Sequence, residues 1–476
     1  MNPSATDLWF LPLGGCGEIG MNLNLYGHNE QWLMVDCGVT FSKVQSTIQP
    51  SPAPQSNVKN DTINNSCRSA DRLVTAKVVQ YADPEFIVQR KDQLAGMIIT
   101  HAHEDHVGAV PYIWPKLSCP LYTTAFTAEV LRRKLARERI AEPGPIIIVD
   151  SEQIQQIGPF RVQWIALTHS IPEPYGVLIE TETGGVFHTA DWKLDHQPVV
   201  GKPYDVDSYK QLAARGIRAV VCDSTNALTA GHSVSEGALQ RGLNHWVGQA
   251  KGRVVVTCFS SNIARLRTIC EVAAANERHV GLLGYSLQNM VGAARATGHW
   301  PDHINLADAF HLGYLPPQDV LLIATGSQGE SNTALARLVA GTHKDIELTA
   351  GDTVIFSSRV IPGNEEDVER LLKRLGEQDI LVVDASDTEW PVHASGHPCQ
   401  QELQQLYQWI QPDIVIPVHG EADHMRVNAD IAKAAGVRCT LTGSNGDLFR
   451  LGRQIAVRRQ MVKTGRLCLY NRAGGQ

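Results

Sequence analysis

Short apolar runs that end in polar residues recur along the chain. Residues 97–99 form one such run, and the sequence continues Thr-His-Ala-His-Glu-Asp-His. The runs at 162–167 and 185–189 end in the same way, before a histidine and an aspartate respectively. Apolar runs of this length, bounded by polar residues, predict strands. The pattern therefore predicts that several strands deliver polar side chains to one edge of a sheet.

The stretch after the run at 97–99 holds four candidate metal ligands, His101, His103, Asp105 and His106. Residues two apart on a helix point to different sides, so an extended or looped backbone is needed to present them together. Such a backbone can turn the first two toward one ion and the last two toward a second. Imidazole and carboxylate ligands suit zinc or manganese. The stretch predicts a two-metal site, and the alternative is a helix start with incidental histidines.

Other strand ends carry further candidates. His169, Asp191 and His419 each follow an apolar run. One such residue alone is usually a turn residue, but the repetition fits a metal site assembled along a sheet edge. Asp36 also ends an apolar run, and we expect it to hold the histidine loop by hydrogen bonds.

The middle of the chain alternates apolar runs with helical stretches. Five runs begin near residues 219, 254, 279, 320 and 353. Strands that alternate with helices predict a parallel sheet, so we expect a second α/β unit. Several runs end in Ser, Thr or Gly, whose hydroxyls and backbone amides suit phosphate groups, although helix caps explain each one singly. Together these ends favour a phosphate-rich substrate.

Three further segments have a clear pattern. Helices are predicted at 83–94, 128–137 and 400–410. Ser, Gln, Asn and Pro dominate residues 42–76, where we expect a mobile surface excursion. The glycine-rich stretch 14–20 is followed by apolar runs rather than a helix, so it is no dinucleotide-binding motif. It is either a simple hairpin or a close approach of the backbone to a metal or phosphate.

Composition narrows the class of protein. A chain of 476 residues predicts two or three compact units. No apolar run approaches the roughly 18 residues of a membrane helix, and the first residues lack the pattern of a secretory signal. We therefore expect a cytoplasmic enzyme with no membrane partner and with reduced, buried cysteines. A net charge of −7 argues against a protein that coats nucleic acid with a generally basic surface. It permits a nuclease that binds phosphates through metals.

The motifs, taken in order, resemble those of the ribonuclease J family. They are the glycine stretch 14–20, the histidine cluster 101–106, and the segments 169–173, 188–191, 223–226, 326–330, 395–397 and 417–421. The resemblance runs from about residue 8 to about residue 451. It implies an α/β fold, namely a metallo-β-lactamase αβ/βα four-layer sandwich with an inserted β-CASP domain.

The resemblance also implies a domain plan. Residues 1–204 and 361–451 would form the metallo-β-lactamase domain, residues 205–360 the β-CASP domain, and residues 452–476 a C-terminal tail. We expect the separate C-terminal domain of the family, which assists dimerisation, to be missing, so a homodimer is less favoured. The 42–76 stretch replaces a shorter family loop, and Tyr285 stands where many relatives are expected to have arginine.

By the same resemblance, the chain binds two zinc ions, with manganese as the alternative. The implied ligands form two sets that share Asp191. The first set is His101, His103 and His169, and the second is Asp105, His106 and His419. Asp223 and His397 match β-CASP motif positions. His397, oriented by Asp223, would protonate the leaving 3′-oxygen or contact a phosphate oxygen in the transition state.

His393 and Ser395 fall where the family contacts the scissile phosphate. Further substrate contacts are predicted at Ser260, Asn262, Ser327, Gln328, Gly329 and Glu330. The implied function is hydrolysis of single-stranded RNA from the 5′ end, with endonuclease activity in addition, in RNA processing or decay. The alternatives are a DNA nuclease, because 2′-hydroxyl contacts cannot be read from sequence, and a silent RNA-binding subunit. A silent relative is expected to lose ligands, and this sequence keeps all seven.

Overall fold

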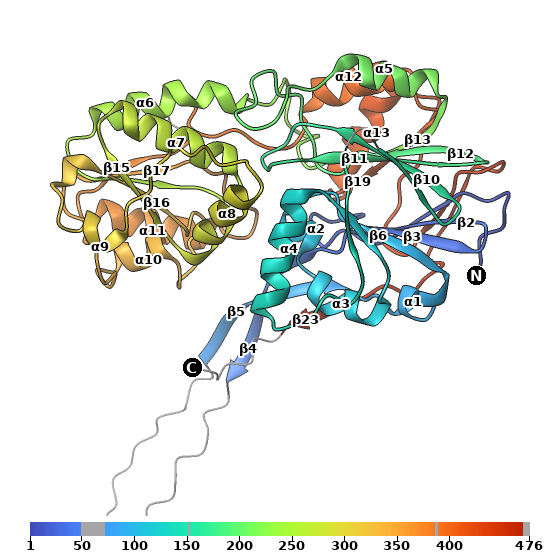
Figure 1. Cartoon of the computed structure of the whole chain (residues 1–476), viewed down its shortest axis with the longest axis horizontal. Helices are drawn as coiled ribbons and strands as arrows, with labels where there is room; N and C mark the ends of the chain where they lie inside the picture. Colours follow the sequence, from blue (N-terminus) through green and yellow to red (C-terminus); the bar gives the residue numbers. More distant parts are fainter. Residues whose placement is uncertain (49–71, 151–152, 386–388, 470–476) are drawn as a thin grey trace, which may run out of the picture.

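The chain folds into two bodies, a two-sheet sandwich and a smaller domain with one parallel sheet (Figure 1). The computed structural model describes residues 1–48, 72–150, 153–385 and 389–469. Strand order is β22-β21-β1-β2-β3-β6-β7-β8 in the first sheet of the sandwich and β20-β19-β13-β12-β11-β10-β9 in the second.

The first sheet consists of β1 (Trp9–Gly14), β2 (Leu23–His28), β3 (Gln31–Val35), β6 (Leu94–Ile98), β7 (Leu121–Thr123), β8 (Ile146–Ile148), β21 (Leu448–Arg450) and β22 (Ala456–Arg458). The second consists of β9 (Ile154–Ile157), β10 (Phe160–Ala166), β11 (Tyr175–Thr181), β12 (Gly184–His188), β13 (Ile217–Asp223), β19 (Ile414–Val418) and β20 (Cys439–Thr440).

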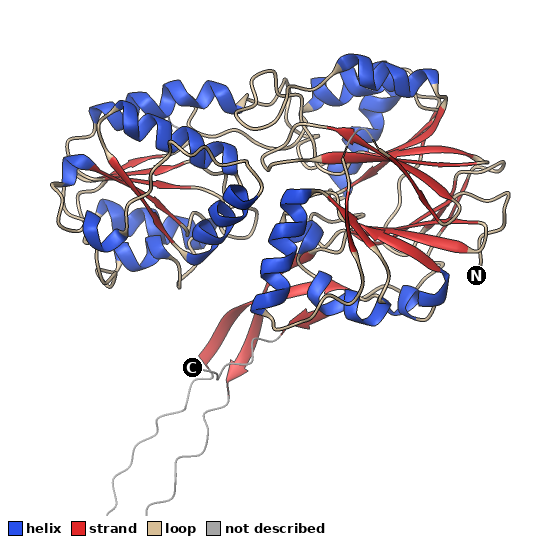
Figure 2. Cartoon of the chain, in the orientation of Figure 1, coloured by secondary structure: helices blue, strands red, loops and turns tan. Residues whose placement is uncertain are grey.

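Helices cover the outer face of each sheet (Figure 2). The first sheet packs against α1 (Glu85–Val88), α2 (Glu104–Val107), α3 (Val110–Leu117) and α4 (Ala125–Arg137). The second packs against α5 (Val206–Ala214), α12 (Gln400–Ile410) and α13 (Ala422–Ala434). Between the sheets, large side chains such as Phe10, Tyr26 and Trp164 are fully buried. This layering is the predicted αβ/βα sandwich.

The smaller domain has a five-stranded sheet in the order β15-β16-β14-β17-β18, and every neighbouring pair is parallel. Its strands are β14 (Val254–Thr257), β15 (His279–Leu283), β16 (Val320–Ala324), β17 (Thr353–Phe356) and β18 (Leu381–Val383). One face packs against α6 (Leu239–Gln249), α7 (Ile263–Ala275) and α8 (Tyr285–Ala296), and the other against α9 (Ala309–Leu312), α10 (Ala334–Val339) and α11 (Glu365–Gly376). Because both faces are covered, the strands are continuous apolar runs.

One strand predicted for the second unit belongs to the sandwich instead. The run near residue 219 forms β13, which pairs in parallel with β12 and β19. A continuous apolar run fits a buried parallel strand in either sheet, so the pattern alone could not assign it. The fifth strand of the smaller domain is β18, which lies beyond residue 360. The domain boundaries given above stay predictions.

Two other predicted segments differ from the structure. The helix expected at 83–94 is only α1 and the short 3₁₀ turn η1 (Lys91–Gln93), because Arg90 leaves the helical region and folds back over the Phe86 ring at 4.1 Å. The excursion expected at 42–76 begins and ends as paired strands, β4 (Val39–Ile48) and β5 (Arg72–Ala82), with β23 (Arg466–Leu469) beside β5 (Figure 1). Residues 49–71 lie outside the described residues. The helix at 400–410 is confirmed, and that at 128–137 starts earlier, at Ala125.

Two expectations from composition can be compared with the described residues. All cysteines among them are free, and most are buried. No helix in this part of the chain is long and apolar enough to cross a membrane.

The two bodies meet at a hydrogen bond between a carboxylate and an imidazole, and its contribution to stability depends on pH. Glu173, after β10, lies 3.0 Å from His299, after α8, and also accepts the Phe126 N–H at 2.8 Å. Burial raises the pKa of Glu173, but these hydrogen bonds outweigh it and hold the pKa below its usual value. Since the folded-state pKa is depressed, the stabilisation is present above the unfolded value of about 4.3 and is lost as pH falls through the folded-state pKa.

We therefore expect Glu173→Gln to lower the free energy of unfolding by about 1 kcal/mol at pH 7 and by much less near pH 3. Urea unfolding at both pH values measures the difference. Glu129→Gln is the control. Glu129 pairs with Arg133 one turn along α4, and the arginine side chain is 35% exposed. Ion pairs at such solvent-accessible positions contribute little to stability. An equal loss at both pH values would contradict the role given to the Glu173 carboxylate.

Candidate metal centre

The backbone after β6 changes from extended to helical within the histidine cluster. His103 is extended, with φ −69° and ψ 148°, and α2 begins at Glu104. His101 and His103 therefore precede the helix, whereas Asp105 and His106 lie on its first turn. This is the looped arrangement that the spacing predicted.

The first group of candidate ligands is His101, His103, His169 and Asp191, whose ligand atoms lie within 4.8 Å of one another. Nδ1 of His103 is 3.1 Å from Nε2 of His101 and 3.0 Å from Nε2 of His169. Nδ1 of His169 donates to the Gly396 carbonyl at 2.6 Å, so its Nε2 carries a lone pair in the neutral ring.

Burial keeps these three imidazoles neutral. It lowers the pKa of His101 and His169 well below the usual value and that of His103 to about 4, with neighbouring histidines adding to the effect in His101 and His169. Three ring nitrogens thus converge beside one carboxylate, and Nε2 of His169 among them carries a lone pair. A cation satisfies such a set of lone pairs.

The second group is Asp105, His106, His419 and again Asp191. Oδ1 of Asp191 lies 3.2 Å from Nε2 of His106 and 3.5 Å from Nε2 of His419. Oδ2 of Asp105 lies 3.6 Å and 3.4 Å from the same two nitrogens. Oδ1 of Asp191 is buried and has no hydrogen-bond partner among the described residues.

The electrostatic environment of this second group stabilises positive charge. Burial lowers the pKa of His106, but Asp191, Asp105 and Asp36 outweigh it and raise that pKa well above the usual value. Burial raises the pKa of Asp191, and the surrounding histidines reverse this effect, so its carboxylate stays ionised. An ionised, buried oxygen without a hydrogen bond is the feature that a bound metal ion satisfies.

Asp36 holds the segment 100–106 in place through hydrogen bonds. It follows β3 and accepts hydrogen bonds from the Thr100 N–H at 2.9 Å, from the Thr100 hydroxyl at 3.0 Å and from Nδ1 of His106 at 2.7 Å. Asn22, after the glycine stretch, donates to the Asp105 carbonyl at 3.1 Å. These contacts orient the His106 ring with Nε2 toward Asp191.

A second histidine–aspartate pair borders both groups. Nδ1 of His397 lies 2.8 Å from Oδ2 of Asp223 and 3.9 Å from Oδ2 of Asp191. Burial lowers the pKa of His397, but Asp223 and Asp191 outweigh it and raise the pKa to about 9. Asp223 is held in turn by the Thr225 N–H and hydroxyl at 2.8 and 2.7 Å. The pair therefore places a protonated imidazole at the edge of the metal centre.

The segment 392–397, called the 392–397 loop below, carries three of the predicted substrate residues and meets the metal centre at Gly396 and His397. Asn226 donates to the Ser395 hydroxyl at 2.7 Å and to the His397 carbonyl at 3.2 Å. His393 is half-buried, and desolvation together with nearby Arg265 lowers its pKa to about 3. Its ring is therefore neutral.

The other predicted substrate residues lie at strand ends of the smaller domain. The Asn262 side chain is buried and engaged internally, since it caps α7 through the Arg265 N–H and donates to Glu236. The Gln328 side chain is likewise engaged, because it donates to the Arg359 carbonyl and accepts the Ile361 N–H.

The side chains of the remaining predicted substrate residues make fewer hydrogen bonds within the protein. Ser260 and Glu330 are half-buried, and Ser327 is buried. Oε2 of Glu330 has no hydrogen-bond partner within the described ranges. A Cβ at Gly329 would lie 2.5 Å from the Asp367 carbonyl carbon, so only glycine fits there.

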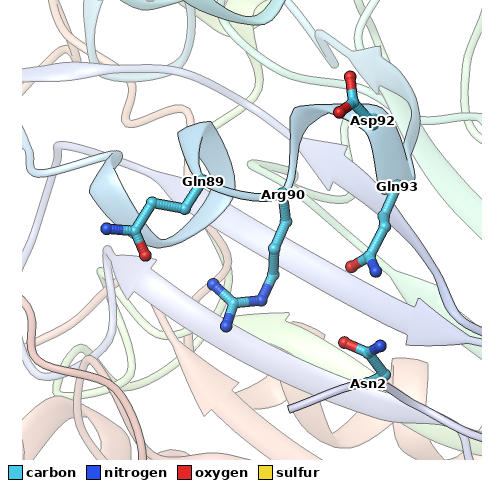
Figure 3. A pocket seen from close by; sticks show the side chains of 5 residues that line it. All are labelled: Asn2, Gln89, Arg90, Asp92 and Gln93. Carbon is cyan, nitrogen blue, oxygen red and sulfur yellow. The ribbon is translucent and has the colours of Figure 1, made fainter.

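A separate surface pocket lies near the N-terminal residues, between α1 and η1 (Figure 3). Asn2, Gln89, Arg90, Asp92 and Gln93 line it. None of the predicted site residues lines it, so it plays no part in the metal centre.

Three families match successive parts of the chain. Residues 21–215 match the metallo-beta-lactamase superfamily, residues 251–375 match "Ribonuclease J, beta-CASP domain", and residues 366–441 match "Zn-dependent metallo-hydrolase RNA specificity domain". Among solved structures, a protein of unknown function from Enterococcus faecalis superposes with a TM-score of 0.60 over 93% of this chain and 100% of its own, at 14% identity. That likeness concerns the fold alone.

Curated relatives match nearly the whole chain. Ribonuclease J of Sinorhizobium meliloti is 41% identical over 94% of this chain and 74% of its own length. Ribonuclease J of Mycolicibacterium smegmatis is 36% identical over 89% of this chain and 71% of its own length, and that of Mycoplasma pneumoniae 30% identical over 92% and 72%. With the two-sheet sandwich, the parallel five-stranded domain and the histidine–aspartate centre, these matches place the chain in the ribonuclease J family of metallo-hydrolases.

Proposed function

We propose that this chain is a metal-dependent ribonuclease that hydrolyses phosphodiester bonds of single-stranded RNA from the 5′ end, with endonucleolytic cleavage as a further activity. The observation that carries the proposal is the junction at Asp191, where two groups of candidate ligands share one carboxylate and adjoin the His397–Asp223 pair. Relatives named ribonuclease J and the match to an RNA specificity domain support RNA as the substrate.

The residues present fit two divalent cations. Asp191 would hold both, His101, His103 and His169 the first, and Asp105, His106 and His419 the second. The donor set of imidazoles and carboxylates suits zinc, with manganese as the alternative. When bound, two such ions would lower the pKa of the attacking water and stabilise charge that develops on the phosphate.

The protein's own groups would complete the reaction. The Asp223 carboxylate, 2.8 Å from Nδ1, favours the protonated form of His397, and in that form His397 would donate its proton to the leaving 3′-oxygen. Asp223 accepts its Nδ1–H, which leaves Nε2–H free to face the substrate. His393 and Ser395 would contact oxygens of the scissile phosphate from the 392–397 loop. A homodimer and a cytoplasmic location stay predictions.

The proposal is tested by comparing the cleavage of RNA and DNA and by measuring the number of metal ions bound per chain. We expect purified protein to hold two divalent ions per chain by elemental analysis and to cleave single-stranded RNA in preference to DNA of the same sequence. Asp105→Asn is expected to lose the second ion and the activity, whereas the exposed Asp423→Asn, at 77% side-chain exposure, keeps both. Equal cleavage of DNA would favour the DNA nuclease, and two bound metals without cleavage of either polymer would favour the silent subunit.

The hydrogen bonds of Asp36 give a separate prediction. Asp36→Asn places an amide against the Nδ1–H of His106 or the Thr100 N–H, so at least one donor loses its acceptor. The His106 ring is then poorly oriented, and we expect metal affinity and activity to fall by about 10–100-fold. Zinc titration against a competing chelator measures the affinity.

Asp92→Asn is the control for Asp36→Asn, because Asp92 lines the pocket of Figure 3 and not the metal centre. Unchanged zinc affinity in Asp36→Asn would show that His106 needs no support from Asp36.

A further inference from the structure

Arg265 is a buried arginine in α7 that none of the predicted sites includes. Its side chain is 1% exposed and forms a two-pronged pair with Glu236, which is 2% exposed. Nη2 donates to Oε1 at 2.8 Å and Nε to Oε2 at 3.0 Å. Burying an ion pair costs several kcal/mol of desolvation. Apolar residues of similar size in its place often give a fold that is equally stable or more stable. The pair is therefore weak evidence for a purely stabilising role.

The rest of the guanidinium faces the 392–397 loop. Nη1 donates to the carbonyl and to the hydroxyl of Ser357, each at 2.7 Å, and the Ser357 hydroxyl donates to the Val392 carbonyl at 2.5 Å. Nη2 donates to the Ala394 carbonyl at 3.2 Å, and Nη1 lies 3.4 Å from Nδ1 of His393. One side chain thus fixes the backbone on both sides of His393.

Glu236 connects the same side chain to the metal centre. Its N–H donates to Asp195 at 3.0 Å, and Asp195 forms a buried ion pair of 2.9 Å with Lys193. The Lys193 N–H donates to the Thr168 carbonyl at 2.8 Å, and Thr168 directly precedes His169. Buried polar contacts therefore run without a break from a strand end of the sandwich to the 392–397 loop.

We propose that Arg265 is a positioning residue that sets the distance between the 392–397 loop and the metal centre, so that His393 and Ser395 reach the scissile phosphate. The inference rests on the proposed function. Arg265 itself touches no substrate in this account. Its planar guanidinium has five N–H donors and hydrogen-bonds Glu236, Ser357 and Ala394 at the same time. The single ammonium group of a lysine cannot do this.

Two variants separate positioning from stability. Arg265→Lys keeps a positive charge beside Glu236 but cannot reach Ser357 and Ala394 together. We expect it to fold, to bind metal fully, and to lose about 100-fold in kcat on single-stranded RNA, because a misplacement of about 1 Å has that cost. KM is expected to stay within a few-fold. The double variant Arg265→Met with Glu236→Gln removes both buried charges, and we expect it to be more stable than Arg265→Met alone but equally slow.

Arg253→Met is the matched control. Arg253 is a buried arginine of the same domain that donates to the Glu347 carbonyl at 2.6 Å and pairs with Asp352 at 3.6 Å. Among the described residues it has no hydrogen bond to the 392–397 loop. It is expected to lower the thermal midpoint while the kcat of the folded, metal-loaded protein stays close to that of the wild type.

Thermal unfolding, metal content, kcat and KM are measured on all variants. Wild-type kcat in a folded, metal-loaded Arg265→Lys would overturn the inference, as would recovery of both stability and kcat in the double variant. Loss of metal in Arg265→Lys, or failure of both variants to fold, would assign Arg265 a structural role and would also overturn it. Absence of RNA cleavage by the wild type would overturn the proposed function instead.

Discussion

Asp191→Asn is expected to lower RNA hydrolysis by at least about 1,000-fold, because metal-ion stabilisation of the transition state amounts to several kcal/mol. Both candidate groups use this carboxylate, and the amide that replaces it carries no negative charge. We expect the variant to bind fewer than two divalent ions per chain and to stay folded, since an amide of the same size and shape replaces the carboxylate. Elemental analysis and initial rates measure the two effects.

The control for Asp191→Asn is Asp195→Asn, four residues away. Asp195 is equally buried but pairs with Lys193 rather than with the histidines. We expect it to lose stability and to keep both ions. A fully metal-loaded and active Asp191→Asn protein would show that the shared carboxylate is not a ligand.

His397→Ala is expected to lower kcat by about 100–10,000-fold without loss of metal, because a positioned general acid contributes that much. A substrate with sulfur in place of the leaving 3′-oxygen tests the role directly, since a thiolate leaves without a proton. If His397 is the general acid, the variant should cleave this substrate at close to the wild-type rate. Initial rates on both substrates give the comparison.

Two outcomes would contradict this role for His397. If the sulfur substrate stays slow with His397→Ala, the imidazole acts as a charge that contacts a phosphate oxygen. If the variant loses metal, His397 is itself a ligand, since one of its ring nitrogens also lies within 4.8 Å of ligand atoms of Asp191, Asp223 and His419. Ser170→Ala is the control, because Ser170 also lies beside the 392–397 loop.

Local sequence was sufficient to predict most of the candidate ligands that the structure brings together. The spacing of His101, His103, Asp105 and His106 requires a change from extended to helical backbone, and α2 begins between the second and third of them. His169 and Asp191 follow β10 and β12, which form where the strands were predicted. In each case the prediction depends on residues close together in the chain.

Features that depend on distant residues could not be predicted in this way. The Arg265 pair joins residues 29 apart, and its contact with Ala394 spans 129 positions. The sheet that contains β13 is decided by its pairing with β19, not by its own sequence. Strands β4 and β5 pair with each other from Val39 and Tyr81 to Ile48 and Arg72, although the composition of residues 42–76 predicted an irregular excursion.

The most direct test of the account uses single-stranded RNA with a 5′-monophosphate and a label at the 3′ end. Wild-type protein is expected to give a ladder of progressively shorter labelled fragments, which is absent with Asp105→Asn. The same RNA with a 5′-triphosphate shows how strongly the reaction depends on the 5′ end. Discrete internal cuts without a ladder would contradict the exonuclease claim, and intact RNA in the presence of two bound metals per chain would contradict the ribonuclease claim itself.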